Sequence, residues 1–264
     1  MDKLAIPIRV KKECYKLQMN KIPSGSFIMG SNKGRGIDDW ANTSMGTFEV
    51  TISRDFWMGI YPITQCQWHS VMGTSPSYFK GDNLPIESIT WLDAIDFCTS
   101  LNNTILSRLD LPENYVFRLP TEAEWEYACR AGSSMQYQIG ETITDLSNVA
   151  WHSDNIPEDN FITQSVGQKL PNAWGLYDML GNVAEMCFDV PVKYPVGTSQ
   201  IDWLGRGGTL PEFRNLRGCS VFHDAGVEDH FTTFGRAYTS GEPNRAYGFR
   251  ICLASQIDES MMNT

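Results

Sequence analysis

Apolar and polar residues along this chain follow two periods, one typical of strands and the other of helices. Residues 48–52 alternate apolar and polar side chains, which predicts a half-buried strand. Residues 17–20 and 26–29 predict two further short strands, because the turn-forming residues 23–25 (Pro-Ser-Gly) separate them. Residues 56–60 predict a fourth strand.

Two helices are predicted where the period of the apolar residues lengthens, and each begins after a threonine. Thr64 is an N-cap for a helix over about residues 65–72, and Gly73 ends it. Thr90 caps the next helix, which carries apolar residues at helical spacing. These residues are Trp91, Ala94, Ile95, Cys98 and Leu101.

A third predicted helix is rich in acidic and aromatic residues. Thr121 and Glu124 form a capping box at its start, and Gly132 closes it. Trp125 and Tyr127 on this helix could belong to a site. The capping box and the aromatic residues are explained at least as well by a structural role, and we predict that role.

Beyond Gly132 the periodicity is lost. Gly, Asn, Asp and Pro are spread over residues 132–250, and residues 248–254 are one of few strand candidates. The pattern predicts an α+β fold with low regular secondary structure and long loops. No linker, charge block or repeat divides the 264 residues, which predicts a single domain.

Composition narrows the classes of partner. The hydrophobic fraction of 42% is enough for one buried core. The net charge of −10 argues against nucleic acid or an anionic membrane as the main partner, because both repel an acidic surface. No stretch approaches the ~20 apolar residues that a membrane-spanning helix needs, and the N-terminus does not resemble a signal peptide.

Cysteine usage indicates a compartment. The seven cysteines are an odd number and form no CxxC pair. Most lie among apolar neighbours, where free cysteine behaves as a small hydrophobic residue. This pattern predicts unpaired thiols in a reducing, cytoplasmic setting.

Four blocks of sequence show the clearest resemblance to a known protein family. They are residues 118–128 (RLPTEAEWEYA), 172–185 (NAWGLYDMLGNVAE), 216–220 (LRGCS) and 248–250 (GFR). In order and spacing, over roughly residues 18–254, they resemble the formylglycine-generating enzyme family, also called the sulfatase-modifying factor family.

This resemblance implies a fold related to that of the C-type lectins, with long loops on a small core. It divides the chain into an N-terminal extension over residues 1–15, a sulfatase-modifying factor domain over residues 16–256 and a C-terminal tail over residues 257–264. Catalytic members of the family oxidise a cysteine of a client sulfatase, using a copper ion held by two cysteines.

The positions that match those two cysteines are occupied here by His223 and Glu228. A rival alignment on residues 206–209 places Glu212 and Arg217 there, so neither register supplies a cysteine. Copper(I) is soft and prefers thiolates, whereas an imidazole and a carboxylate suit a harder divalent ion. Copper is therefore not expected as a cofactor.

The resemblance also implies structural calcium. In the family, a Gly-Asn-x-x-Glu turn binds the ion, so Glu185 would supply a carboxylate and Gly181 and Val183 their carbonyls. Asn148 and Asp159 could belong to a second calcium site or could simply make turn hydrogen bonds. The full set that matches this second site is Asn148, Val149, Asp159 and Phe161.

Three functions remain open. The first is a family member that lacks copper-dependent oxidase activity and binds a peptide or protein partner in the former substrate groove. The second is an active oxidoreductase that acts on a sulfatase cysteine or another substrate through an unusual site. The third is a lectin-like variable protein of a diversity-generating retroelement, because the unusual residues gather at 209–247.

The groove hypothesis selects particular residues. Arg236 is the expected anchor, since a guanidinium offers a rigid fork of donors to a carboxylate or to backbone carbonyls. Phe222 and Tyr238 are expected to add apolar contact area. Arg250, within the Gly-Phe-Arg block, is expected to be tied into the core instead.

Overall fold

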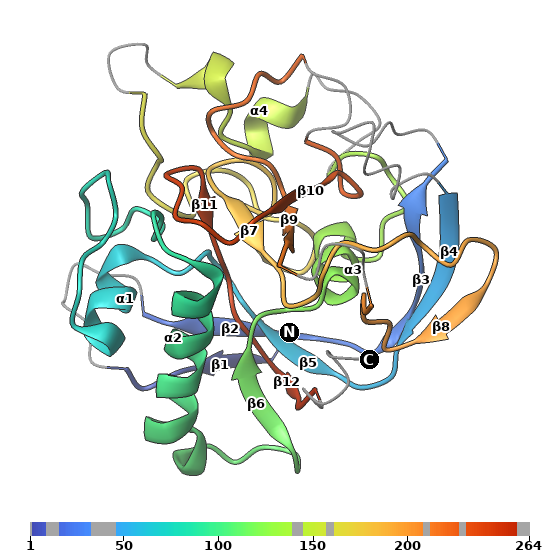
Figure 1. Cartoon of the computed structure of the whole chain (residues 1–264), viewed down its shortest axis with the longest axis horizontal. Helices are drawn as coiled ribbons and strands as arrows, with labels where there is room; N and C mark the ends of the chain where they lie inside the picture. Colours follow the sequence, from blue (N-terminus) through green and yellow to red (C-terminus); the bar gives the residue numbers. More distant parts are fainter. Residues whose placement is uncertain are drawn as a thin grey trace.

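A five-stranded antiparallel sheet crosses the lower part of the computed structural model in Figure 1. The structure describes residues 2–8, 16–32, 46–138, 145–156, 161–207, 212–226 and 231–257. In spatial order the strands are β1 (Lys3–Ala5), β2 (Gln18–Ile22), β5 (Phe56–Gly59), β12 (Cys252–Ser255) and β6 (Tyr115–Arg118). Strand β1 pairs with β2 although it lies in the predicted N-terminal extension, so residues 3–5 belong to the sheet of the domain.

Two smaller sheets complete the strand content of the described residues. One has the order β10-β9-β7-β11 and the other β3-β4-β8 (Figure 1). The first consists of β10 (Arg236–Thr239), β9 (Arg214–Arg217), β7 (Ala184–Met186) and β11 (Tyr247–Gly248). The second consists of β3 (Gly25–Ser31), β4 (Gly46–Ile52) and β8 (Ser199–Ile201).

The three predicted helices are confirmed, and each has the capping box that its sequence encodes. They are α1 (Gln65–Met72), α2 (Trp91–Thr104) and α3 (Glu122–Arg130). The prediction that Gly132 closes α3 is one residue late, because Ala131 is the C-cap and adopts the left-handed conformation, with φ 48°. The short elements are η2 (Leu106–Arg108), α4 (Leu146–Val149) and η4 (Ser153–Asn155).

The predicted strands are also confirmed, with one exception. Residues 248–254 do not form one strand, because β11 ends at Gly248 and β12 begins at Cys252. Between them the backbone places Arg250 in the interior, where it is fully buried. The break in the strand therefore serves the burial of one charged side chain.

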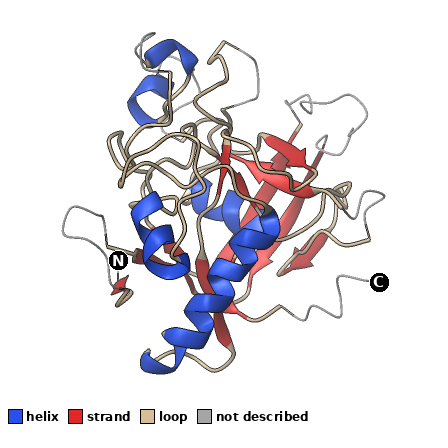
Figure 2. Ribbon diagram, turned by 60° about the vertical axis from the view of Figure 1, so that its left-hand side comes forward, coloured by secondary structure: helices blue, strands red, loops and turns tan. Residues whose placement is uncertain are grey.

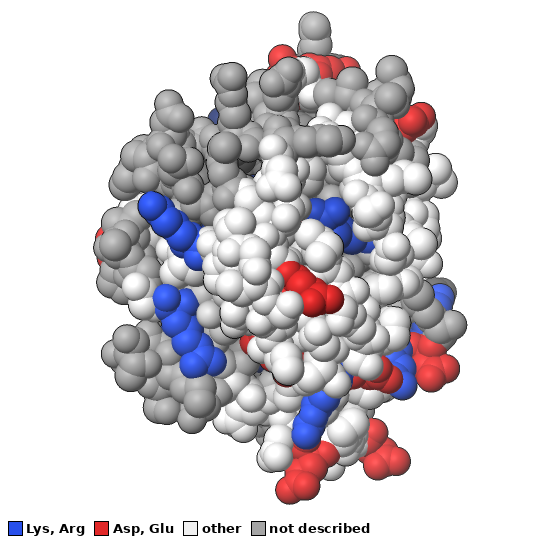
Figure 3. Space-filling view, turned by 90° about the vertical axis from the view of Figure 1, so that its right-hand side faces the viewer, with Lys and Arg blue, Asp and Glu red and all other residues white. Residues whose placement is uncertain are grey.

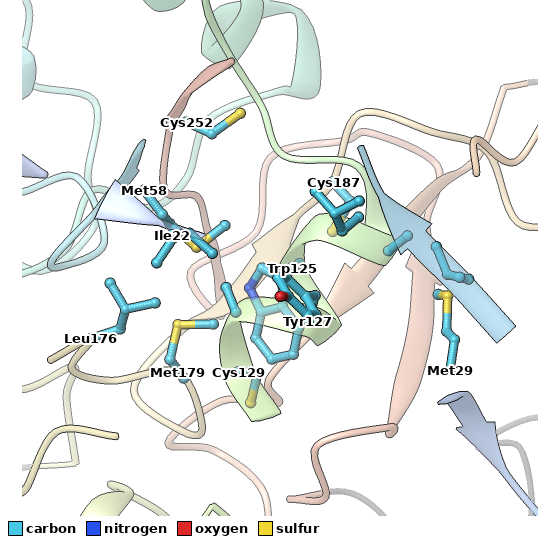
Figure 4. Packing of buried hydrophobic residues seen from close by; sticks show 14 of the residues in the cluster. Ile22, Met29, Met58, Trp125, Tyr127, Cys129, Leu176, Met179, Cys187 and Cys252 are labelled. Atoms are coloured by element: carbon cyan, nitrogen blue, oxygen red, sulfur yellow. The ribbon is translucent and has the colours of Figure 1, made fainter. Parts of the chain in front are cut away.

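Helix α3 is buried along its whole length, which is unusual for so acidic a sequence. Trp125 is fully buried at the centre of the larger apolar cluster, near Met179 and Ile22 (Figure 4). A second apolar cluster lies between α2 and the five-stranded sheet, and Figure 2 shows α2 lying beside strands. The structural role predicted for this acidic helix is confirmed.

Arginines neutralise Glu122 and Glu126 of α3, one from the helix itself and two from β9 and β10. Glu122 accepts hydrogen bonds from Arg236 Nε at 2.6 Å and Nη2 at 2.8 Å. Glu126 accepts from Arg130 Nε and Nη2 and from Arg217 Nη2. All of these side chains are at least nine-tenths buried, so each charge depends on its partners for solvation.

The cysteines depart from the sequence prediction. Cys66 is disulfide-bonded, whereas Cys98, Cys129, Cys187, Cys219 and Cys252 are free. A disulfide is rare in reducing compartments, so the argument for a cytoplasmic setting loses part of its basis and the compartment stays a prediction. Within the described ranges, no helix has the length and apolar character that crossing a membrane requires.

Candidate functional site

Aromatic side chains from distant parts of the chain meet at the surface beside residue 222. The Phe222 ring lies 5.9 Å from that of Phe79 and 5.4 Å from that of Phe161, between centroids. The guanidinium of Arg245 lies 5.2 Å from the Phe222 ring and 5.8 Å from the Tyr78 ring. We call Tyr78, Phe79, Phe161, Phe222 and Arg245 the aromatic face.

The aromatic face is open to solvent. Tyr78 is 67% exposed and Phe161 is 43% exposed, although large aromatic side chains are usually buried. Arg245 is also exposed. Phe79 and Phe222 are half-buried beneath them. A contiguous group of aromatic rings that reaches the surface beside a cation is a feature of binding surfaces rather than of ordinary protein surface.

A buried glutamate holds the loops of the aromatic face together. Glu87 accepts a hydrogen bond from the backbone N–H of Phe79 at 2.9 Å and one from the Ser88 hydroxyl at 2.5 Å. Ser88 N–H donates in turn to the carbonyl of Asn244, the residue before Arg245. Burial raises the pKa of Glu87, and the two donors only partly oppose that shift. The loop that carries Phe79 and the loop that carries Arg245 are therefore both anchored at Glu87 and Ser88.

His223 follows Phe222 and is half-buried. Its Nδ1 lies 2.9 Å from the Ser220 hydroxyl, and its carbonyl accepts a hydrogen bond from Ser153 N–H. Burial lowers the pKa of His223, so the neutral imidazole is favoured. Glu228, the other position that matches a family cysteine, lies outside the described residues.

The free thiols are poor candidates for copper ligands or nucleophiles. Burial raises the pKa of Cys219 and of Cys129 to about 12. Burial likewise raises the pKa values of Cys98, Cys187 and Cys252. The thiolate is the form that reacts and binds metal, so burial disfavours both roles for these cysteines.

The structure places Arg236 in the interior, which makes the predicted role of groove anchor wrong. Its guanidinium is paired with Glu122, and Nη1 donates to the carbonyl of Val192 at 3.0 Å. Tyr238, on the same strand, packs its ring 5.3 Å from that of Phe213. Of the three predicted groove residues, Phe222 is the one that lies in the aromatic face.

The cation of the aromatic face is Arg245, which the sequence reasoning missed. It also missed Tyr78 and Phe79. Two adjacent aromatic residues in the loop 73–82, which is rich in Ser, Gly and Pro and has no strand or helix period, were the available signal. A loop has little core to fill, so aromatic residues there point to binding.

Glu185, the carboxylate of the predicted calcium site, has protein partners. Its carboxylate accepts from Arg250 Nε and Nη2 at 2.6 Å and 2.7 Å and from Trp125 Nε1 at 2.7 Å. Oε1 takes only one of these three bonds, so it keeps a free lone pair. Arg250 is fully buried, as the sequence predicted.

A second carboxylate near Glu185 has an oxygen without a partner. Asp178 is 1% exposed, and its Oδ2 accepts from Gly167 N–H at 2.7 Å. Its Oδ1 is buried and accepts no hydrogen bond within the described residues. Burial raises the pKa of Asp178 to about 6, and the negative charge of Glu185 contributes to that rise. Among the described residues, no group of three or more His, Cys, Asp or Glu side chains could hold a metal ion, so calcium stays a prediction. Asp178 adds a carboxylate to its candidate ligands, which are Glu185, Gly181 and Val183.

The residues of the second predicted calcium site are only partly described. Asn148 is exposed on α4, and its carbonyl accepts a hydrogen bond from Leu170 N–H. Val149 is fully buried, and Phe161 belongs to the aromatic face. Asp159 lies outside the described residues. This site stays a prediction.

Known proteins and a family model resemble this chain over most of its length. The family model described as "Sulfatase-modifying factor enzyme 1-like domain" matches residues 9–255. The chaperone protein LppX of Paenibacillus barcinonensis is 34% identical over 188 residues, which cover 56% of this chain and 67% of that protein. The formylglycine-generating enzyme of Mus musculus is 30% identical over 139 residues, 48% of this chain but only 33% of the enzyme.

A solved structure matches nearly the whole chain. "Treponema denticola variable protein 1" superposes with a TM-score of 0.77 and 26% identity, covering 96% of this chain and 99% of that one. The predicted fold, an α+β relative of the formylglycine-generating enzymes with long loops, is confirmed.

Replacing Arg236 with Ala is expected to lower the free energy of unfolding by about 3–5 kcal/mol, because Glu122 would keep a buried charge without its main partner. The matched control is Arg245→Ala, an exposed arginine whose loss should change stability by less than about 0.5 kcal/mol. Urea denaturation of both variants measures the difference. Equal stability of the two would show that Arg236 is not part of the scaffold.

Proposed function

The chain belongs to the family of sulfatase-modifying factor enzyme 1-like domains, and we propose that it is a member without copper-dependent cysteine oxidase activity that binds a peptide or protein partner. The observation that carries this proposal is the aromatic face. It is exposed, holds one cation, and lies beside His223, which stands where the resemblance would place a catalytic cysteine.

The chemistry of the described side chains does not favour the oxidase. A copper site of the family type needs two thiolates, and the matching positions supply an imidazole and a carboxylate. A thiol with a pKa of about 12, such as that of Cys219, is ionised in roughly one molecule in 10⁵ at pH 7. Cys219 is therefore a weak substitute for the missing pair.

The aromatic face has the composition of an interaction surface. Aromatic residues and arginine dominate the energetics of protein interfaces, because they bury large area around a few strong polar contacts. Arg245 has an exposed guanidinium that suits a carboxylate or backbone carbonyls of a partner. The partner class that fits is a peptide segment with apolar side chains next to an acidic group.

Two relatives support a binding role through their names. One is a variable protein of nearly the same length, and another is a chaperone protein. A variable, lectin-like ligand-binding protein is therefore the second candidate, because residues 220–247 contribute Phe222 and Arg245 to the aromatic face. An active oxidoreductase with an unusual site at His223 is the remaining alternative.

We also propose a structural calcium ion bound near Asp178 and Glu185. The supporting observation is Asp178 Oδ1, a buried carboxylate oxygen that accepts no hydrogen bond within the described ranges. Carbonyls of Gly181 and Val183 would complete part of the ligand set. The ion would fix a long segment of irregular backbone that has few ladder hydrogen bonds of its own.

The purified protein is expected to leave the cysteine of a Cys-x-Pro-x-Arg sulfatase peptide unchanged, with or without added copper, because the copper-binding thiolates are replaced. Mass spectrometry of the peptide detects loss of the thiol and formation of the aldehyde. A catalytic formylglycine-generating enzyme under the same conditions is the positive control. Aldehyde formation by this protein would contradict the proposal and favour the oxidoreductase alternative.

Peptides selected from a random phage-displayed library on the wild-type protein should bind the double variant Phe222→Ala, Arg245→Ala about tenfold or more weakly. The reason is the loss of the central ring and the cation of the aromatic face. Tyr238→Ala is the matched control, since Tyr238 packs against Phe213 instead. Equal peptide affinity for wild type and double variant, by fluorescence anisotropy, would refute the assignment of the face.

Calcium is expected to raise the melting temperature, because an ion that binds only the folded state at a hundred times its dissociation constant adds about 2.7 kcal/mol. For a chain of this size that is roughly 5–10 °C. The difference between melts with calcium and with a chelator should disappear in Asp178→Asn. Identical melts of the wild-type protein in both conditions would rule out the site.

A further inference from the structure

A cavity of about 520 Å³ lies between β3, the first residues of β4 and the C-terminal end of α3. No residue of the aromatic face is among its lining residues. Its volume is within the range of about 300–1,000 Å³ that small-molecule sites occupy. It is therefore a separate place at which to look for a ligand.

Arg130 lines this cavity with part of its guanidinium unused. Nε and Nη2 donate to Glu126 Oε1 at 2.9 Å and 2.7 Å, and Nη2 also donates to the Gly30 carbonyl at 3.0 Å. Nη1 makes no hydrogen bond to any residue that the structure describes. The side chain is only 8% exposed, so its free donor reaches the cavity from a mostly buried position.

The charges beneath the cavity do not balance. Arg130, Arg217 and Arg236 form one buried network with two carboxylates, Glu122 and Glu126. These five side chains alone hold one more positive than negative charge. Burial and the nearby charge of Glu122 raise the pKa of a third carboxylate, Asp189, to about 7, so Asp189 offsets that surplus only in part at neutral pH. Asp189 lies at its far end, where it accepts from the backbone N–H groups of Glu122 and Gly205. Arg130 is the member of this network that lines the cavity, and its Nη1 is the donor without a hydrogen bond.

Aromatic rings form walls of the cavity. Phe27 and Tyr127 lie with their ring centroids 5.2 Å apart, and both line it. Phe234 lines it too, with its ring 6.0 Å from the Arg130 guanidinium carbon. A flat apolar ligand can contact these rings, whereas a small hydrated ion would leave them facing water.

The described surface around the cavity has no patch of positive charge that would attract an anion away from Arg130 (Figure 3). Figure 3 views the side of the molecule on which β3, β4 and β8 lie in Figure 1. Basic and acidic side chains are scattered over the described part of that face without a single field of one sign. Recognition of an anion here depends on Arg130 itself rather than on long-range steering.

We propose that this cavity binds a small organic monoanion with an aromatic body. A carboxylate or sulfonate accepts both hydrogens of Arg130 Nη1 and neutralises the surplus charge, while the ring system lies against Phe27, Tyr127 and Phe234. The site is independent of the partner-binding role proposed above, because it uses none of the residues of the aromatic face.

Two fluorescent probes test the proposal on the full chain. Anilinonaphthalene sulfonate has an aromatic body with one negative charge, and phenyl-naphthylamine has the same ring system without the sulfonate. Saturable binding of one equivalent of the sulfonate, at least tenfold tighter than the neutral amine, is expected because only the sulfonate meets a charged donor. Absence of saturable sulfonate binding, or equal affinity for both probes, would overturn the proposal.

Variants of one lining residue separate the cavity from other dye-binding surfaces. Ser134 is exposed, lines the cavity and makes no hydrogen bond with the described residues, so Ser134→Trp fills the space and leaves the fold intact. This variant should lose about tenfold or more in sulfonate affinity, while Ser134→Ala binds like wild type. Unchanged affinity in a folded Ser134→Trp would place the dye elsewhere and refute the site.

A charge-specific variant completes the test. Arg130→Lys keeps the positive charge but loses the fork, so it should weaken sulfonate binding and leave the amine's affinity unchanged. Circular dichroism and the melting temperature report whether the variant folds, and the Ser134 pair decides the matter if it does not. Equal loss for both probes in a folded Arg130→Lys would argue against a role for the guanidinium.

Discussion

The buried ion pairs of helix α3 are the constraint on which the rest of the molecule depends. Burying Glu122 and Glu126 costs several kcal/mol per charge unless each carboxylate is fully paired. Arg130 of α3 supplies one partner and the others come from β9 and β10, so both carboxylates are fully paired only when the small sheet forms around the helix. Burial raises the pKa of Glu126, but the charges of Arg130 and Arg217 outweigh that effect and hold its pKa below the usual value. Its contribution to stability is therefore present at neutral pH and is lost as the pH falls through the lowered pKa.

The buried ion pairs also decide which arginines are available at the surface to bind a partner. Buried carboxylates pair with Arg217, Arg236 and Arg250, and each of these guanidinium groups also donates to backbone carbonyls. Arg245 has no such role and lies over aromatic rings at the surface. The residues that hold the interior are therefore distinct from the residues of the aromatic face. Such a division between scaffold and surface loops is common where loops carry function.

The extent to which sequence predicts this structure follows from the range of each interaction. The sequence predicts helix α1 with its true ends because Thr64 and Gly73 act on the residues directly beside them. Arg236 was misassigned because its partner Glu122 is 114 residues away, and nothing local distinguishes a buried arginine from an exposed one. The predicted strand over 248–254 failed for the same reason, since Arg250 turns inward to reach Glu185 across 65 residues. The family resemblance supplied the fold, but not the residues that gather around Phe222.

The two proposed ligands, a calcium ion and an organic anion, would bind at polar groups that the scaffold leaves without a full set of partners. A buried polar atom without a partner is costly, and proteins keep few of them. Asp178 Oδ1 is one such atom, and Arg130 Nη1, at the edge of the cavity, likewise makes no hydrogen bond with the described residues. The acidic one stands among oxygen atoms that suit a hard cation. The basic one faces aromatic rings and a confined space, which suit an organic anion. Arginines of the same interior hold both α3 and the turn at Gly181, so under the two proposals each ligand would complete the pairing of a group that the scaffold leaves unsatisfied.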